Sequence, residues 1–367
     1  RNDPKLYGGH NPFLQTADVK NANFYIAEYP DTHNETGLAQ SKLWDMGTLC
    51  ITIAANIADT GILGIPACFP DSVMGFIPYD GISDVRFVKY CFDMLQRDCK
   101  QISQGTAQDN LSWQKLSTIE FPVPPIETQR RIADILSAYD DLIENNRKQI
   151  KLLEEAAQRL YKEWFVDLRF PGHEHTKIVD GVPEGWEKQP LSSIADIRMG
   201  QSPKSEFYNQ IGEGLPFHQG VGSYGNRFVR DETYSTSFTR IAEAGSILFS
   251  VRAPVGRLNI TKNKIVIGRG IAALNHKSRL QSFLFYMLKE RFFKDNLVGN
   301  GSIFASISKE ELLNQQFIIP CEDIMVQYDK AAQNIDDRIA TLDRQTELLT
   351  QARDRLLPKL MSGEVEV

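Results

Sequence analysis

Glycine-rich stretches between residues 200 and 270 carry the side chains of this sequence that are best suited to reading nucleic acid. Arginine can donate two hydrogen bonds to guanine, asparagine and glutamine can make two with adenine, and glycine lets the backbone approach phosphates closely. Any one of these residues taken alone fits an ordinary solvated turn better, but the set predicts a nucleic-acid interface. The candidate contacts are Gln201, Ser202, Lys204, Gln219, Ser223, Tyr224, Asn226, Arg227, Arg230, Arg252, Arg257 and Arg269.

Catalytic motifs are missing from the sequence. It has no G-x-x-x-x-G-K-[S/T] phosphate loop and no Glu-x-Lys pair of the kind found in metal-dependent nucleases. Gly268-Arg269-Gly270 is more typical of a turn than of a cofactor cradle, and His173-Glu174-His175 is more typical of a solvated loop than of a metal site. No Ser/His/Asp or Cys/His arrangement stands out. We therefore expect a non-catalytic chain that holds no metal and no cofactor.

The composition is that of a globular protein of about two domains. The chain has 367 residues, of which 42% are hydrophobic and 24% charged, and its formal net charge is −6. Taken alone, that charge argues against a protein that coats DNA or an anionic membrane. Five cysteines without a CxxC motif predict reduced thiols and a cytoplasmic location. The opening residues resemble neither a signal peptide nor a natural start, so we expect the first residue not to be the natural one.

The chain repeats itself at an offset of 196 residues. The second copy also has an opening, GWEKQPLSSIADIRMGQS at 185–202, without a counterpart in the first copy. We therefore expect the first copy to lack roughly that stretch. Equivalent positions include Phe121 and Phe317, Pro124 and Pro320, Asp140-Asp141 and Asp336-Asp337, and Arg159-Leu160 and Arg355-Leu356.

Each copy divides into a mixed region of short strands with one helix, followed by a long helix. The predicted strands lie at 49–53, 247–251 and 264–267, and the predicted shorter helices at 84–100 and 279–295. The expected fold is α+β, with two mixed α/β domains separated by two long antiparallel coiled-coil helices. The predicted segments are a first domain at 1–121, a helix at 122–170, a linker at 171–184, a second domain at 185–316 and a distal helix at 317–367.

The long helices carry apolar residues at alternating steps of four and three, which is the a/d pattern of a coiled coil. Asn146 interrupts the first series, where it either fixes the register or faces solvent. Pro358 is expected to kink or end the second helix. A helix of about 35 residues would span on the order of 50 Å and act as a ruler. The predicted seam is Ile132, Leu136, Tyr139, Ile143, Ile150, Leu153, Leu160, Ile335, Ile339, Leu342, Leu349 and Leu356.

The first long helix ends with more large apolar side chains than a seam requires: Tyr161, Trp164 and Phe165. Because aromatic residues are enriched at protein interfaces, these three are candidates for docking a partner. Packing onto the adjacent globular domain is the equally weighted alternative.

Charge is distributed unevenly along the chain. Residues 181–316 have a net charge of +5, residues 1–121 a net charge of −5, and both helical regions are acidic. The nucleic-acid prediction is therefore strongest for the second domain, and in the first it depends on the repeat. Polar loop residues of the first domain are the corresponding candidates: Lys5, Tyr7, His10, Gln15, Asn21, Asn23, Lys42 and Asn56.

Essentially the whole chain resembles the specificity (S) subunit of type I restriction–modification systems. The resemblance is carried by FPVPPIETQRRIADILSAYDDLIENNRKQIKLLEEAAQRLYKEWFVDLRFPG at 121–172, GVPEGWEKQPLSSIADIRMGQSP at 181–203, and LLTQARDRLLPKLMSGEVEV at 348–367. The sequence departs from the family pattern at its start, where the expected G-W-x-x-x-x-L opening of the first domain is absent.

The resemblance implies that each globular domain reads one half of a split, asymmetric sequence on double-stranded DNA. It also implies that the helices set the gap between the half-sites and dock two methyltransferase subunits, and that restriction subunits join the complex. S-adenosylmethionine, ATP and Mg²⁺ would belong to those partners. The rival interpretations are a coiled-coil adaptor that binds only proteins and a fused nuclease or methyltransferase.

Overall fold

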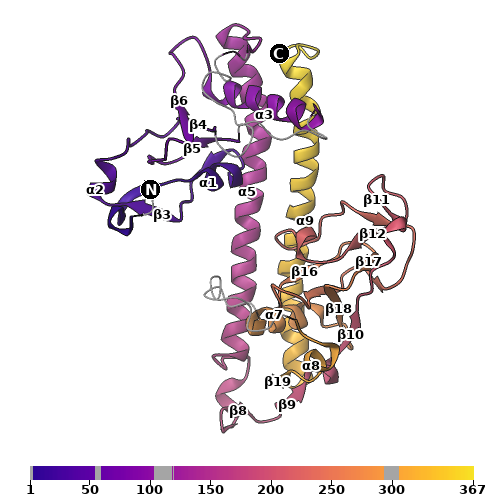
Figure 1. Ribbon diagram of the computed structural model, residues 1–367. Coiled ribbons are helices and arrows are strands. Elements are labelled where there is room, and N and C mark those ends of the chain that lie inside the picture. The colour runs from indigo at the N-terminus through magenta and orange to yellow at the C-terminus, as the bar shows by residue number, and fades with distance from the viewer. Residues whose placement is uncertain (1–2, 54–58, 103–117, 119, 293–305) are drawn as a thin grey trace. The chain divides into compact units, whose positions relative to one another are not determined.

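The computed structural model describes residues 3–53, 59–102, 118, 120–292 and 306–367, with the side chains of 97–102 left aside (Figure 1). The chain divides into two compact units. Unit 1 comprises Arg1–Gln149 and Leu342–Val367, and unit 2 comprises Ile150–Thr341. Each unit therefore combines one globular part with a stretch of each long helix.

In unit 1 the central strand β4 lies between β5 and β6, and a following helix packs on the sheet. The sheet order is β2-β5-β4-β6, with β2 parallel to β5 and the other pairs antiparallel. Phe24, Leu49, Ile62, Phe87 and Tyr90 are buried between sheet and helix. The elements are η1 (Pro4–Leu6), β1 (Tyr7–Phe13), α1 (Thr16–Asn21), β2 (Tyr25–Ile26), β3 (Asp31–His33), α2 (Glu35–Leu38), β4 (Leu49–Thr52), β5 (Thr60–Leu63), β6 (Val73–Phe76) and α3 (Val85–Ile102).

In unit 2 the corresponding strand β15 lies between β16 and β18, in a sheet of order β10-β18-β15-β16. A second sheet, β11-β13-β12-β17-β14, contains the parallel pair β12 and β17. The elements are η2 (His173–His175), β7 (Ile178–Val179), β8 (Val182–Pro183), β9 (Glu187–Pro190), α6 (Leu191–Ile194), β10 (Ala195–Met199), η3 (Ser205–Phe207), β11 (Tyr208–Asn209), β12 (Leu215–His218), η4 (Val221–Ser223), β13 (Tyr234–Ser235), β14 (Ile241–Ala242), β15 (Ile247–Ser250), β16 (Leu258–Ile260), β17 (Ile265–Ile267), β18 (Ile271–His276), α7 (Gln281–Phe292), α8 (Lys309–Leu313) and β19 (Gln316–Ile319).

The opening at 185–202, which sequence comparison finds in the second copy, contributes two strands and a helix to unit 2. β9 pairs with β19, and β10 pairs with β18. Trp186 and Leu191 of this opening are buried. In the described part of unit 1, β6 has β4 as its ladder partner and forms the edge of its sheet, whereas its equivalent β18 lies between two strands.

The long helices are α5 (Ile126–Phe165) and α9 (Glu322–Met361), each of 40 residues. Pro122, Pro124 and Pro125 exclude helical backbone before α5. Glu322 and Asp323 place negative charge at the first turn of α9, where the helix dipole favours it. Pro358 lies inside α9, so the prediction that the helix could end there is wrong: it continues to Met361.

The two helices run antiparallel where they pack within a unit. In unit 1, Ile132 and Leu136 near the start of α5 share a core with Leu357 and Leu360 near the end of α9. In unit 2 the start of α9 packs against the last part of α5. There the Tyr328 hydroxyl donates to the Ala157 carbonyl oxygen on α5 at 3.1 Å. The predicted seam residues are buried or half-buried. Asn146 is buried rather than solvated, which excludes one of its two interpretations.

The predicted fold class is confirmed. β4, β15 and β17 lie within the predicted strand ranges. α3 and α7 occupy the predicted shorter helices, although residues 293–295 lie outside the described part of the chain. Among the described cysteines, Cys50, Cys68, Cys91 and Cys321 are unpaired.

Candidate nucleic-acid interface

Four turns of unit 2 come together at the ends of neighbouring strands and carry most of the candidate side chains. They follow β10 (200–204) and β12 (219–223), and they connect β15 to β16 (251–257) and β17 to β18 (268–270). Because β12 and β17 are parallel neighbours, the turns that follow them leave the sheet at the same edge. The topology therefore gathers segments that lie up to 70 residues apart in the sequence.

Backbone hydrogen bonds hold these turns to one another. The Gly268 amide donates to the His218 carbonyl oxygen at 2.8 Å, and the Gly270 amide donates to the Gln219 carbonyl oxygen at 3.1 Å. The Val251 amide in turn donates to the Gly270 carbonyl oxygen at 2.9 Å. Gln219 and Val251, the residue before Arg252, are thus connected through Gly270 by two backbone hydrogen bonds.

Two glycines make this close approach sterically feasible. A Cβ atom on Gly200 would lie 2.1 Å from the Gly268 carbonyl oxygen, and one on Gly270 would lie 2.3 Å from the Gln219 carbonyl oxygen. Both distances are far inside van der Waals contact, so any side chain would force the turns apart. Gly200 and Gly270 therefore do more than form turns. They let the backbones of three turns, those after β10, β12 and β17, pack directly against one another.

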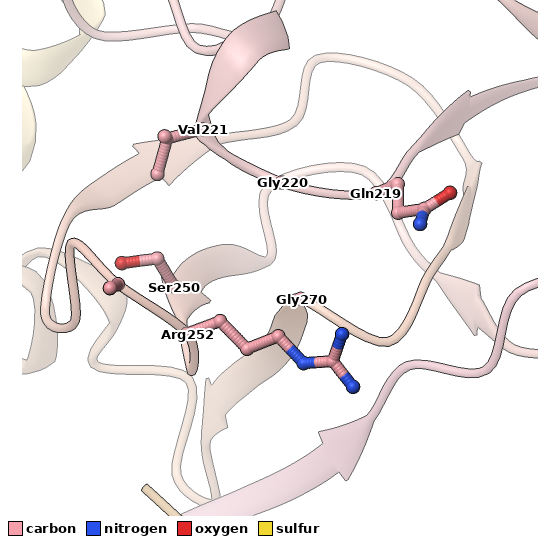
Figure 2. A pocket seen from close by; sticks show the side chains of 7 residues that line it. Gln219, Gly220, Val221, Ser250, Arg252 and Gly270 are labelled. Carbon is pink, nitrogen blue, oxygen red and sulfur yellow. The ribbon is translucent and has the colours of Figure 1, made fainter. Parts of the chain in front are cut away.

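The turns enclose a hollow of about 260 Å³, shown in Figure 2. Gln219, Gly220 and Val221 line it from the turn after β12, and Gly270 from the β17–β18 turn. Ser250 at the end of β15 lines it together with Arg252 and Ala253 of the β15–β16 turn. The Arg252 side chain extends past Gly270 toward the side on which Gln219 lies. The hollow thus brings together two of the predicted base-reading side chains, 33 residues apart in the sequence.

His218, which the sequence analysis did not single out, anchors the turn after β12. Its side chain is buried, and its ring nitrogens lie 2.8 Å from the Ser223 hydroxyl and 2.9 Å from the Asp231 carboxylate. The hydrogen bond from His218 lowers the pKa of the Asp231 carboxyl. The Ser223 hydroxyl also donates to the Gly220 carbonyl oxygen at 3.2 Å. The three residues form a Ser/His/Asp arrangement, but the hydroxyl proton is engaged within the loop, so we interpret it as an anchor.

Arg227 is not a surface residue, and its prediction as a DNA contact is wrong. Its side chain is 3% exposed, lies 2.5 Å from the Asp336 carboxylate and 3.8 Å from that of Glu154, and stacks on the Phe285 ring at 3.8 Å. Nearby acidic and phenolic groups raise the pKa of Arg227 against the lowering effect of burial, so it stays charged. The guanidinium fastens the 219–230 loop to α9.

Tyr224 is also unsuited to a direct contact through its hydroxyl, because that oxygen is buried. Its ring packs on the core that contains Ala242 and Ile265. Burial raises the pKa of the Tyr224 phenol. The prediction of Tyr224 as a contact is therefore corrected for its hydroxyl, and for its half-buried ring it stays a prediction.

The remaining candidates of unit 2 lie at or near the surface. Arg230 donates to the Tyr224 carbonyl oxygen at 3.2 Å, and Lys204 lies 3.8 Å from the Glu206 carboxylate. The Ser202 hydroxyl accepts from the Arg269 amide at 3.2 Å. Gln201, Asn226, Arg252 and Arg269 are exposed, and Arg257 is half-buried.

The candidates of unit 1 lie on separate loops. Gln15 is the N-cap residue of α1, and its side-chain amide donates to the Asp31 carboxylate at 2.9 Å. The Lys42 ammonium lies 3.7 Å from the centre of the Trp44 ring, and the half-buried Tyr7 ring stands 5.1 Å from that of His33. Lys5, His10, Asn21 and Asn23 are exposed, and Asn56 lies outside the described residues. These contacts do not bring the candidates together.

The aromatic end of α5 is part of the core of unit 2. Tyr161 is buried among Phe283, Tyr328 and Phe165, and Trp164 packs against the same core. Of the two interpretations of these aromatic residues, packing onto the globular part is the one that the contacts support.

Each unit contains a tyrosine–aspartate pair that the sequence analysis missed, fully buried in unit 1 and partly buried in unit 2. The Tyr90 hydroxyl donates to Asp140 at 2.6 Å, and the Tyr286 hydroxyl donates to Asp336 at 2.7 Å. Burial, and then the adjacent carboxylate, raise the pKa of Tyr90. Both members of the pair differ by the repeat offset of 196, so extending the self-comparison into the shorter helices could have found it.

Within the described residues, no group of three His, Cys, Asp or Glu side chains is placed to hold a metal ion. His173 of the His-Glu-His segment lies 2.9 Å from the Phe170 carbonyl oxygen through its Nδ1. None of the described helices is long and apolar enough to cross a membrane.

Comparison with known proteins finds one family in both halves of the chain. The family model described as type I restriction modification DNA specificity domain matches residues 3–155 and 183–357. A putative type I restriction enzyme MjaX specificity subunit of Methanocaldococcus jannaschii is 34% identical over 265 residues, which are 71% of this chain and 62% of that relative, so the match spans less than two thirds of its length. The MjaIX specificity subunit of the same organism is 26% identical over 99% of this chain and 88% of its own length.

A solved structure, the S subunit of a type I restriction–modification system from M. genitalium, has the same fold. It matches with a TM-score of 0.55 and 16% identity over 98% of this chain and 91% of that chain.

Proposed function

Because the chain belongs to the family of type I restriction–modification DNA specificity proteins, we propose that it is the subunit that reads the target sequence on double-stranded DNA. The observation that carries this proposal is the hollow of unit 2, which Arg252 and Gln219 line from two turns that hydrogen bonds and glycine packing hold together. Turns whose backbone is fixed before binding lose little conformational freedom when they bind. The region around the hollow, residues 181–316, also carries a net charge of +5, which favours a polyanion.

Unit 1 is proposed to read a second, different half-site. In each unit a central strand lies between two antiparallel neighbours, with β4 of unit 1 in the place of β15 and α3 in the place of α7, and the family model matches both halves. The two units carry different loop residues, so the complete target would be asymmetric. The acidic composition of residues 1–121 means that DNA contacts in this unit would be local or supplemented by partner subunits.

The helices α5 and α9 are proposed to set the number of unread base pairs between the half-sites. A straight helix of 40 residues is about 60 Å long. Inserting one heptad into each helix is expected to lengthen the preferred gap between the half-sites. Methylation-site mapping of DNA modified by the complex measures that gap directly, and an unchanged gap would refute the ruler.

Two methyltransferase subunits are the proposed protein partners, with restriction subunits joining the same complex. Leu152 on α5 and Leu348 on α9 are equivalent at the repeat offset and are 64% and 48% exposed, respectively. Exposed leucines at equivalent positions of two helices fit two equivalent partner surfaces. We further propose that S-adenosylmethionine, ATP and Mg²⁺ act in those partners, that this chain itself is non-catalytic, and that the complex works in the cytoplasm, where its DNA is.

Binding of the assembled complex to DNA tests this function. The chain with its methyltransferase partners is titrated with labelled duplexes that contain or lack the mapped target, at several salt concentrations. A sequence reader is expected to prefer the target by a factor on the order of 10³ or more and to lose affinity steeply with salt. A coiled-coil adaptor predicts no target preference. Methyl transfer by the chain alone would instead support the fused-enzyme interpretation.

A further inference from the structure

Arg252 is the arginine that the hollow of unit 2 presents to a ligand. Its side chain is exposed, and its guanidinium has no hydrogen-bond or ion-pair partner among the residues that the structure describes. The other basic groups nearby differ: Arg227 is buried on Asp336, Arg230 donates to a carbonyl oxygen, and Lys204 lies near Glu206. Arg269 is exposed too, but it does not line the hollow.

The backbone beneath Arg252 is held in place from two directions. The preceding residue, Val251, donates to Gly270, and Gly270 donates to Gln219, so the positions of both readers are coupled. On the other side, the buried Ser250 hydroxyl donates to the Pro254 carbonyl oxygen at 2.6 Å and accepts from the Arg257 amide at 2.8 Å. These bonds fix the turn that carries Arg252 without using its side chain.

The chemistry of the two side chains specifies what they recognise. A guanidinium presents two parallel N–H donors, which match N7 and O6 of guanine in the major groove. The Gln219 amide offers one donor and one acceptor, the pattern that pairs with adenine. Gly220 and Gly270 add no side chains, which leaves room for a base edge between the two readers.

We propose that Arg252 selects a guanine in the half-site read by unit 2, and that Gln219 reads an adenine at the neighbouring base pair. This inference rests on the proposed function and deepens it, since it assigns a specific base to a specific side chain. Arg252 is thereby a specificity-determining residue, whereas Arg227 attaches the 219–230 loop, which carries Gln219, to α9.

The test uses the chain assembled with its methyltransferase partners and a library of randomised target duplexes. Wild type, R252A, R252K, Q219A and a control, R198A, are compared by methylation-site mapping and by binding affinity. Arg198 is an exposed arginine of the same unit outside the hollow, and its guanidinium donates to the Ile241 carbonyl oxygen at 2.9 Å. R252K keeps the positive charge but loses the two-pronged donor, so it separates base reading from charge.

The expected result is a loss of guanine preference at one position of one half-site, by about tenfold to a hundredfold, in both R252A and R252K. Q219A is expected to relax an adjacent position of the same half-site, and R198A to leave the target unchanged. Retention of the guanine preference in R252K would overturn the proposal. So would a uniform loss of affinity for all sequences in R252A, with a salt dependence shallower by about one phosphate contact. A wild-type complex without any sequence preference would instead contradict the proposed function itself.

Discussion

In each unit one aspartate of a long helix accepts a hydrogen bond from a tyrosine of the globular part, but the two units pair that aspartate with different arginines. In unit 1, Asp140 binds Tyr90 and the guanidinium of Arg353, which lies on α9. In unit 2, Asp336 binds Tyr286, at the repeat-equivalent position, and Arg227 from the 219–230 loop. We call this cluster of a tyrosine, an aspartate and an arginine the socket. It joins α5 to α9 in unit 1 and the 219–230 loop to α9 in unit 2.

This difference shows how a duplicated scaffold can support two unlike recognition surfaces. The tyrosine–aspartate bond attaches the shorter helix to the long helix in both copies, and it depends on neither reading surface. The arginine that pairs with the aspartate comes from a different segment in each unit, from α9 in unit 1 and from the 219–230 loop in unit 2. Ala157, at the repeat position of Arg353, is buried without charge in unit 2, so no second arginine competes there.

The largest expected effect is that of removing Arg227. R227A leaves the carboxylates of Asp336 and Glu154 partly buried without their main cation, at a cost of about 3–5 kcal/mol in the free energy of unfolding of unit 2. Denaturant unfolding of the chain measures this cost. The 219–230 loop would also lose its attachment, so target binding by the complex is expected to fall.

Two matched variants sharpen that prediction. N226A changes the exposed neighbour in the same loop and is expected to leave the unfolding free energy within about 0.5 kcal/mol. R353A removes the equivalent arginine of unit 1, which is more exposed, and is expected to cost about 1–3 kcal/mol. A cost for R353A that equals or exceeds that of R227A would contradict the contrast between the two sockets.

Sequence reasoning could predict the repeat and the fold class, because each leaves a local or periodic pattern. The proline run ending at Pro125 and the four–three spacing of apolar residues specify the start and the inner face of α5. Glycines of the kind seen at Gly268 and Gly270 mark turns in any protein. That these turns pack against the Gln219 backbone depends on strand pairing across the sheet, which no local pattern encodes.

Arg227 and Arg252 show the limit of such reasoning. Both lie after predicted strands or turns and next to an apolar residue, Phe228 or Val251, so the sequence offers no means to separate them. Arg227 is buried and Arg252 is exposed because Asp336, 109 residues after Arg227, pairs with Arg227 and not with Arg252. Burial of a charged residue is decided by its partner, and the partner is known only once the chain is folded.

Removing the two tyrosine hydroxyls is expected to have a smaller and unequal effect. Y90F leaves the buried Asp140 with Arg353 alone, at a cost of about 1.5–3 kcal/mol, whereas Y286F leaves Asp336 with both Arg227 and the Ser282 hydroxyl at 2.6 Å, at a cost of about 1 kcal/mol. Unfolding free energies of the two variants, each compared with wild type, measure the difference. Equal costs would mean that the third partner, Ser282, adds nothing to the socket of unit 2.

The smallest expected effect is a pH dependence of opposite sign in the two units. The hydrogen bond from His218 lowers the pKa of Asp231 in unit 2, whereas burial, followed by Glu144 and Asp140, raises the pKa of Asp141 in unit 1. A lowered carboxyl pKa contributes stability above the unfolded value of about 3.9, and that contribution is lost as the pH falls through the folded value. A raised carboxyl pKa lowers the stability of the fold while the carboxyl is charged, and this loss disappears as the pH falls through the folded value and the group becomes protonated.

The variants D231N and D141N convert this contrast into a measurement. At pH 6, D231N is expected to be less stable than wild type by about 1 kcal/mol, the net value of a hydrogen bond, and the gap should close toward pH 3. D141N, which resembles the protonated state, is expected to be more stable than wild type at pH 6, with a gap that also closes in acid. Urea unfolding between pH 3 and 6 gives both gaps. If they had the same sign, the charge environments of the two carboxyls would not differ as their contacts require.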